Sequence, residues 1–311
     1  MAFLRNKYFI GGLLVYVAAV LYLHFAFEQP LREMFVSFTI LGIGFSYIGW
    51  WLTKDLSQPY HLPAIKKESW FLLLLVAWIV FYITYGGSLI NKSLPASWVE
   101  NPPIYSIIIF LRKLLFFVLV PFGVYKAFGF SLKDFGLKGS PVKFFSQKSI
   151  LVFILLSIAA LLFQYFLSSG AKGVRSGAFD TAQLLIGLPL CFVYLIFDAG
   201  LIEEFFFRGL LQSRLSVLLK STAGSIVVSA IIFGLVHAPG LYLRGAESEG
   251  IEEQLPFTFF AAYTVAYMSV AGIFLGIIYS KTKNLWLVVA IHAMVDLLPN
   301  LGDFIHTWGI K

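Results

Sequence analysis

Apolar runs of about 20 residues recur along the chain, and short polar connections with breakers such as "SQPY" and "NPP" separate them. Each run is long enough to cross a bilayer as a helix. The pattern predicts an all-α, polytopic membrane bundle of eight or nine transmembrane helices. The nine candidate spans are residues 8–27, 35–52, 70–90, 104–128, 149–168, 184–212, 221–238, 257–280 and 284–301.

Composition supports the membrane class. The chain is 59% hydrophobic with 33 Phe, and its mean hydropathy is +0.85. The net charge of +7 is spread over the connections rather than clustered, so we expect a lipid bilayer and no nucleic acid as partner. The single cysteine, Cys191, lies in an apolar run and excludes an intrachain disulfide.

The distribution of Lys and Arg predicts a cytoplasmic N-terminus. In that orientation the inside connections hold fifteen Lys and Arg and the outside connections six, leaving out Arg112 and Lys113 within a span. The first run follows Arg5 and Lys7 and is too long for the apolar region of a signal peptide. We therefore expect an uncleaved first span in a multi-pass integral membrane protein.

Polar composition divides the chain into two regions. Residues 1–125 form N-terminal transmembrane helices without an ionisable cluster that suggests chemistry, whereas 126–311 form a core with the unexpected polar groups. The basic connection 126–148 is amphipathic enough to lie at the membrane interface. The acidic loop 244–256 is interpreted as solvated.

The segment "EEFFFRG" (203–209) places two carboxylates and an arginine in an apolar stretch, where charges are rare and usually functional. Glu204 and Arg208 are four residues apart, so they share a helix face and can pair. Glu203 points about 100° away from Glu204. We expect that Arg208 neutralises Glu204 while Glu203 faces a cavity. The alternative is an interfacial ion pair where the helix leaves the bilayer.

Two histidine segments add ionisable groups: His237 ends "FGLVH", and "HAMVD" places His292 and Asp296 on one helix face. If the spans around Lys220 form an antiparallel hairpin, Glu203 and His237 each lie 17 residues from its turn, about 25 Å along their helices. They would then be level, as a shared site requires. His292 is about 15 Å from the next turn, so convergence is permitted.

Two other features carry weaker indications. Asp198 precedes Glu203 by five residues and is interpreted as a structural or cavity-lining group. The glycines Gly272 and Gly276, four residues apart, indicate a close-packing helix surface rather than chemistry.

A carboxylate and an imidazole aimed at one point can hold and deprotonate a water. A second histidine with an Asp or Asn can stabilise the oxyanion that forms when this water attacks a carbonyl. Alternatively, Glu203, His237 and His292 could ligate zinc, whose bound water would be the nucleophile. Either route hydrolyses an amide. No G-x-S-x-G motif is present, and Cys191 has no evident base nearby in the sequence.

The three motifs, in this order and spacing, resemble the CPBP (ABI) family of intramembrane proteases, which includes the type II CAAX prenyl endopeptidases. "EEFFFRG" fits E-E-x-x-x-R, "FGLVH" fits F-x-x-x-H, and "HAMVD" fits H-x-x-x-(N/D). The stretch "FSLKDFGLK" is also similar to this family. The resemblance covers about residues 130–300 and leaves the first four spans largely outside.

The resemblance implies an intramembrane endopeptidase that cuts a membrane-associated protein or peptide. Its implied catalytic residues are Glu203, Glu204, His237, His292 and Asp296, with Arg208 in support. Glu203 and His237 would activate the water, Glu204 would fix the first-motif helix, and His292 with Asp296 would support the oxyanion. Family members are described both as metalloproteases and as glutamate proteases. The helix lacks H-E-x-x-H, which favours the glutamate mechanism with no cofactor; zinc is the alternative.

Asp296 departs from the prenyl-protease branch, which usually has Asn at this position. Asn can donate a hydrogen bond to an oxyanion, whereas an ionised Asp cannot. Asp296 must therefore be protonated, orient His292 or bind metal. The departure weighs against a prenylated CAAX substrate and favours a bacterial-type member, in a prokaryotic inner membrane, that acts on another membrane-associated peptide.

Two other classes of function stay open. A scaffold or peptide-binding immunity protein of the same fold would not need the complete motif set. A proton-coupled transporter could use Glu203, His237 and His292 as a relay. The chain shows no inverted repeat or pair of broken helices, which weakens the transporter interpretation.

Overall fold

The computed structural model describes residues 6–56, 68–137, 146–244 and 255–311, and regular secondary structure in these ranges is entirely helical. Within them, nine helices are long and apolar enough to cross a membrane, which confirms the predicted all-α polytopic bundle. Their bounds are Lys7–Phe27, Leu31–Leu56, Glu68–Ser93, Pro102–Ala127, Gln147–Leu167, Thr181–Leu219, Thr222–Leu243, Phe257–Thr282 and Leu285–Trp308.

Several spans combine α-helical stretches with short π-helical or 3-10 turns. The first five spans and their connections contain α1 (Lys7–Phe27), α2 (Leu31–Ser37), η2 (Phe38–Phe45), α3 (Ser46–Thr53), η3 (Lys54–Leu56), α4 (Glu68–Phe81), η4 (Tyr82–Gly86), α5 (Gly87–Ser93), α6 (Ala96–Val99), α7 (Pro102–Lys113), η5 (Leu114–Leu119), α8 (Val120–Ala127), η6 (Leu132–Phe135), α9 (Gln147–Leu167), η8 (Ser169–Ala171) and α10 (Lys172–Arg175). The last four spans contain α11 (Thr181–Leu195), η9 (Ile196–Leu201), α12 (Ile202–Glu204), η10 (Phe205–Gln212), α13 (Ser213–Leu219), α14 (Thr222–Leu235), α15 (Ala238–Arg244), α16 (Phe257–Thr282) and α17 (Leu285–Trp308).

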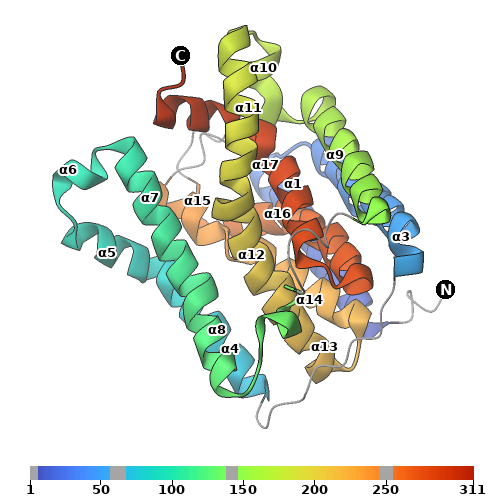
Figure 1. Cartoon of the computed structure of the whole chain (residues 1–311). Coiled ribbons are helices and arrows are strands. Elements are labelled where there is room, and N and C mark those ends of the chain that lie inside the picture. Colours follow the sequence, from blue (N-terminus) through green and yellow to red (C-terminus); the bar gives the residue numbers. More distant parts are fainter. Residues whose placement is uncertain (1–5, 57–67, 138–145, 245–254) are drawn as a thin grey trace.

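The core of the bundle lies in its C-terminal region. In Figure 1, α12, α14, α16 and α17 occupy the middle, α4 to α8 form one flank, and α3 and α9 lie on the other side. The apolar windows of the last two spans are each 61% buried, against 11% for the first two. The residues that resemble the protease family are therefore also those with the most protein around them.

The first-motif helix, which we define as Thr181–Leu219, runs without interruption over 39 residues. The π-helical turns η9 and η10 flank the short α-helical turn that holds Glu203 and Glu204. Turns of this kind are rare and occur frequently at functional sites. The helix ends at Lys220, whose φ of 48° is left-handed, and Ser221 then caps α14. The hairpin expected around Lys220 is present.

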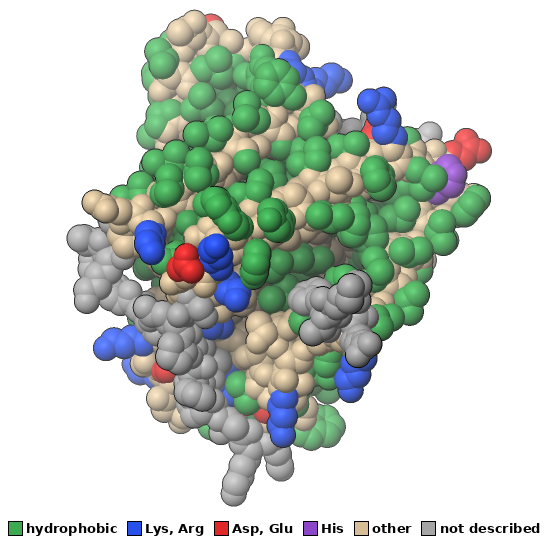
Figure 2. All heavy atoms as spheres, turned by 90° about the vertical axis from the view of Figure 1, so that its right-hand side faces the viewer, with side chains coloured by type: hydrophobic (Ala, Val, Ile, Leu, Met, Phe, Trp, Pro, Cys, Tyr) green, Lys and Arg blue, Asp and Glu red, His purple; other side chains and the backbone are tan. Residues whose placement is uncertain are grey.

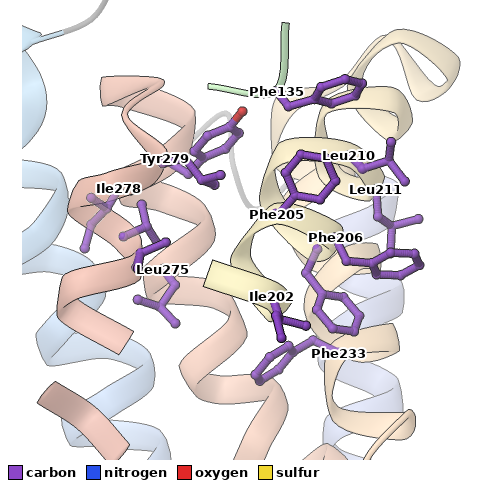
Figure 3. Packing of buried hydrophobic residues seen from close by; sticks show 14 of the residues in the cluster. Phe135, Ile202, Phe205, Phe206, Leu210, Leu211, Phe233, Leu275, Ile278 and Tyr279 are labelled. Carbon is purple, nitrogen blue, oxygen red and sulfur yellow. The ribbon is translucent and has the colours of Figure 1, made fainter. Parts of the chain in front are cut away.

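The three phenylalanines after the two glutamates are core residues. All three belong to the buried cluster, and Figure 3 shows Phe205 and Phe206 among the packed side chains of this cluster. Each ring contacts a ring from a different element: Phe205 packs on Phe135, Phe206 on Phe117 and Phe207 on Phe233. Because Phe117 belongs to η5, the N-terminal region contributes directly to the packing of the first-motif helix.

Gly272 and Gly276 of α16 lie where neighbouring helices approach closely. A Cβ on Gly272 would stand 2.9 Å from the Ala230 backbone, and one on Gly276 would stand 2.7 Å from the Gln212 side chain. Their carbonyls accept hydrogen bonds from Arg208 at 3.5 Å and from Gln212 at 2.9 Å. The predicted close-packing surface is present, and it also anchors the first-motif helix.

Apolar side chains dominate the outer surface, as lipid contact requires. Figure 2 shows them over most of one face, with many of the Lys and Arg side chains toward its lower part. Exposed large side chains occur on many spans, among them Phe25, Trp70 and Leu185. The protein is therefore a multi-pass integral membrane protein.

Two arginines that were counted as connection charges are buried instead. Arg208 pairs with Glu204, and Arg214 Nη2 lies 2.5 Å from Glu68 Oε2; the two arginine side chains are 1% and 0% exposed. The first-motif helix extends beyond its expected end at residue 212 and takes Arg214 into the bundle. Thirteen inside charges against six then support the cytoplasmic N-terminus, which stays a prediction. The expectations for residues 126–148 and 244–256 fall partly outside the described residues.

Candidate active site

Glu203 and His237 face each other across the hairpin. Glu203 Oε2 lies 3.6 Å from His237 Nε2, so equal spacing from the turn at Lys220 does bring the two side chains level. The distance is longer than a direct hydrogen bond between these atoms. A polar pair at this separation can share one water molecule.

The second nitrogen of His237 fixes the orientation of its ring. His237 Nδ1 lies 2.6 Å from the Phe233 carbonyl, one of the last carbonyls of α14. A carbonyl only accepts, so Nδ1 carries the proton; when the ring is neutral, Nε2 therefore presents a lone pair toward Glu203. A water between the two groups would donate one hydrogen to each, and its oxygen lone pairs would stay available for attack.

Glu204 belongs to a separate, buried cluster. Its Oε1 accepts from Arg208 Nη1 at 2.8 Å and lies 2.6 Å from His292 Nδ1. The three side chains are at most 5% exposed. The pairing expected from the four-residue spacing is present, and Glu204 additionally holds His292. The two adjacent glutamates therefore have different partners.

His292 links this buried cluster to Asp296. His292 Nε2 lies 3.2 Å from Asp296 Oδ2, while Nδ1 faces Glu204. Both facing atoms are carboxylate oxygens, so the ring donates to both only when both of its nitrogens carry protons. Of the three roles open to Asp296, this contact matches the one in which the carboxylate orients His292.

Burial separates the partly exposed side chains of the expected set from the enclosed ones. The side chains of His237 and Glu203 are 30% and 19% exposed, and that of Asp296 is 30% exposed. The other side chains of the expected set are almost completely enclosed. The geometry thus offers an accessible group of three residues supported from behind by buried charges.

Phe233 contacts both groups, and only its place in the F-x-x-x-H motif indicated it beforehand. Its ring centroid lies 4.9 Å from that of His237 and 6.0 Å from that of His292. The Arg208 guanidinium lies 4.5 Å from the same ring, a cation–π distance. Together with its carbonyl bond to His237, the ring makes Phe233 a packing centre of the site.

Lys113 brings the N-terminal region into the site. Its Nζ lies 2.6 Å from Oδ2 of Asp198, five residues before Glu203 on the first-motif helix. This ion pair gives Asp198 a partner from the N-terminal region, while the expectation that residues 1–125 hold no ionisable cluster that suggests chemistry stays a prediction. The sequence did offer a clue to this pair. A single charge is costly in the membrane interior, so opposite charges in two different spans are expected to pair.

The three side chains considered as zinc ligands do not fit that metal. Both nitrogens of His292 face carboxylates and His237 Nδ1 faces a carbonyl, which leaves His237 Nε2 and Glu203 directed at a common point. Catalytic zinc sites take three protein ligands. Across the described ranges, no group of three His, Cys, Asp or Glu side chains is arranged to hold a metal ion.

Comparison with known families supports the assignment of the motifs. Residues 182–298 match the family model described as type II CAAX prenyl endopeptidase Rce1-like, and this segment contains all three motifs. No curated protein and no solved structure matches the chain. The fold is that of a multi-pass membrane protein, and its segment 182–298 is similar to the CAAX-protease family. Over residues 182–298 the chain is Rce1-like, which confirms the resemblance to the CPBP family.

Proposed function

We propose that this protein is an intramembrane endopeptidase that hydrolyses a peptide bond of a membrane-associated protein or peptide. The observation that carries the proposal is the pair formed by Glu203 Oε2 and His237 Nε2, 3.6 Å apart and partly exposed. An acceptor pair of this kind suits the activation of a water molecule. The Rce1-like family match over residues 182–298 points to the same reaction class.

Glu203 is the general base in this mechanism. The water donates hydrogen bonds to Glu203 and to His237 Nε2 and attacks the substrate carbonyl carbon. As the new carbon–oxygen bond forms, Glu203 takes one proton and the carbonyl π electrons move onto oxygen. When the tetrahedral intermediate collapses, the carbon–nitrogen bond breaks and the proton on Glu203 passes to the leaving amine. Atoms and charge balance without a metal ion or other cofactor.

His292 lies enclosed behind the accessible group, with both ring nitrogens on carboxylates, and supports the developing oxyanion through its charge rather than by a direct hydrogen bond. Glu204 and Asp296 hold its ring from both sides, and a ring with both nitrogens protonated carries positive charge. A charge fixed before the reaction begins stabilises an oxyanion more effectively than solvent that must reorient. In this scheme Arg208 balances Glu204 and keeps it from accepting the catalytic proton.

The substrate in this proposal is a peptide at the membrane, presented to a bundle with a cytoplasmic N-terminus in a prokaryotic inner membrane. Asp296 stands where the prenyl-protease branch usually has Asn and contacts His292 as an acceptor. This difference favours a peptide without a prenyl group.

The proposal is tested with protein reconstituted in lipid nanodiscs and two internally quenched peptides. One peptide carries a farnesylated CAAX sequence and the other is its unfarnesylated twin. Membrane proteomes from cells with wild type and with Glu203→Gln extend the search to natural substrates. Wild type is expected to cleave at least one of these, and Glu203→Gln none. Glu100→Gln, on the exposed cap of α6, serves as the matched control with unchanged cleavage.

Three results would contradict the proposal. Equal behaviour of wild type and Glu203→Gln in all assays favours a non-catalytic scaffold or immunity protein. Proton flux into liposomes that depends on Glu203, without cleavage, favours a transporter. Cleavage that a chelator abolishes and zinc restores would replace the glutamate mechanism with a metal-dependent one.

A further inference from the structure

Helix α17 contains a proline shortly after the third motif. Pro299 lies three residues after Asp296, inside a helix that continues to Trp308. Proline has no amide hydrogen and its ring crowds the carbonyl four residues earlier. In α17 that carbonyl belongs to Val295, which consequently has no helical donor. In the membrane interior such a carbonyl must find its partner within the protein.

Gln164 of α9 supplies this partner. The glutamine is 3% exposed, and its Nε2 donates to the Val295 carbonyl and to the Met294 carbonyl. Its Oε1 accepts from the Leu298 amide at 3.3 Å. One side-chain amide thus occupies the break in the α17 ladder, using both of its donors and its acceptor oxygen.

The same bonds fix the backbone at Asp296. The Val295 carbonyl and the Asp296 nitrogen belong to one planar peptide unit, so the bond from Gln164 sets the orientation of that unit. On the other side, the Asp296 carbonyl accepts from Asn300 Nδ2 at 2.8 Å. Side-chain amides therefore hold the peptide units on both sides of the residue that contacts His292.

Packing around Pro299 leaves little room for another arrangement. The chain that follows α9 passes directly over the proline, and a Cβ on Gly170 would stand 2.7 Å from Pro299 Cγ. Two neighbouring elements therefore hold this part of α17. Gln164 of α9 binds its free carbonyl, and the turn after α9 packs against Pro299.

We propose that Gln164 is a positioning residue of the active site, which acts through the Val295–Asp296 peptide to place Asp296 against His292. The inference rests on the proposed endopeptidase function. It assigns to α9, outside the three motifs, the task of holding the third motif in its working geometry.

The first test replaces Gln164 with leucine, which keeps the size and removes every hydrogen bond. With either quenched peptide, Gln164→Leu is expected to lower kcat by about tenfold and to change KM by less than about twofold. The control is Ser157→Ala, which changes another buried side chain of α9. It is expected to leave kcat unchanged. Hydrogen exchange of the peptide that contains Leu298 should quicken in Gln164→Leu, because its amide loses the acceptor that Gln164 supplies and the neighbouring Val295 carbonyl loses its side-chain donor.

The second test restores the helix ladder by a different route. Pro299→Ala supplies an amide hydrogen for the Val295 carbonyl, so in this background Gln164→Leu is expected to cost less than about threefold in kcat. Combined with Asp296→Ala, Gln164→Leu should add no further loss, since its effect passes through Asp296.

The outcomes separate the two proposals. Faster exchange at Leu298 with unchanged kcat would overturn the positioning role and leave the proposed function intact. A loss of kcat that Pro299→Ala does not relieve, or that adds fully to Asp296→Ala, would also overturn it. Absence of cleavage by wild type in every assay would instead overturn the proposed function itself.

Discussion

The adjacent residues Glu203 and Glu204 belong to two polar groups that differ in exposure and in the distances to their partners. The pair Glu203–His237 is partly exposed and spans 3.6 Å, whereas Glu204 is buried with Arg208 and His292 at 2.8 and 2.6 Å. Tight buried partners hold a charge in one state, because releasing either partner leaves an uncompensated ion. A looser, accessible pair can take up a water and a proton. Adjacent carboxylates are thus suited to different tasks.

The helix geometry explains how one residue of sequence separates the two environments. Neighbours on an α-helix point about 100° apart, so Glu203 faces α14 while Glu204 faces α17. Phe233 stands between the two groups, with its ring against Arg208 and its carbonyl on His237. Variants that affect one group and spare the other test whether this division is functional.

The largest effect is expected from the accessible group. Glu203→Gln keeps the shape and removes the base, so cleavage of the quenched peptides should fall by about a thousandfold. The thermal unfolding temperature should stay close to that of wild type, because the ion-pair partner of Glu203, His237, is partly exposed. Activity within tenfold of wild type would show that Glu203 is not the base.

The buried group should respond in the opposite way. Arg208→Met leaves Glu204 enclosed without its guanidinium, which destabilises a buried pair by about 3–5 kcal/mol. We expect a lower unfolding temperature and poor recovery from detergent extraction, in contrast to Glu203→Gln. The double variant Arg208→Met with Glu204→Gln removes both charges and should recover much of the stability. Wild-type stability of Arg208→Met alone would contradict the division.

A smaller effect is expected where the N-terminal region meets the site. Lys113→Met removes the partner of Asp198 and a positive charge near Glu203. Asp198 is buried and would lose its charged partner, so the loss of stability should be about 1–3 kcal/mol. Cleavage should fall by several-fold, and Asp198→Asn in the same protein should restore stability but not cleavage. Full cleavage by Lys113→Met would return the first four spans to a purely structural role.

Much of the architecture could be predicted because each membrane span requires a long apolar run, which is visible in the sequence. Runs of apolar residues set the nine spans, and the left-handed turn at Lys220 lies where the pattern placed a hairpin. The contact between Glu203 and His237 followed from counting residues on two helices of known rise. Helix length and rise are local properties, so sequence carries them.

Other features depend on which helices pack against each other. A single sequence does not reveal these helix–helix contacts. Arg214 was expected in a connection, yet Glu68 from a distant span pairs with it inside the bundle. Nothing in the sequence of its own span distinguished Gln164. Its role follows from its contact with α17, which contains Pro299. Each partner lies on another helix, beyond the reach of periodicity on its own span.

The smallest effect is expected from Asp296→Asn, which converts the third motif to the residue usual in the prenyl-protease branch. The Asn carbonyl oxygen can still accept from His292, so we expect cleavage of the unfarnesylated peptide to change by less than about threefold. Asp296→Ala removes the acceptor and should cost about tenfold. Because Asn can also donate to an oxyanion, an equal gain with both quenched peptides would indicate an oxyanion role at this position. A gain in cleavage limited to the farnesylated peptide would make residue 296 a determinant of substrate choice. A loss as large as that of Asp296→Ala would show that the carboxylate charge is essential.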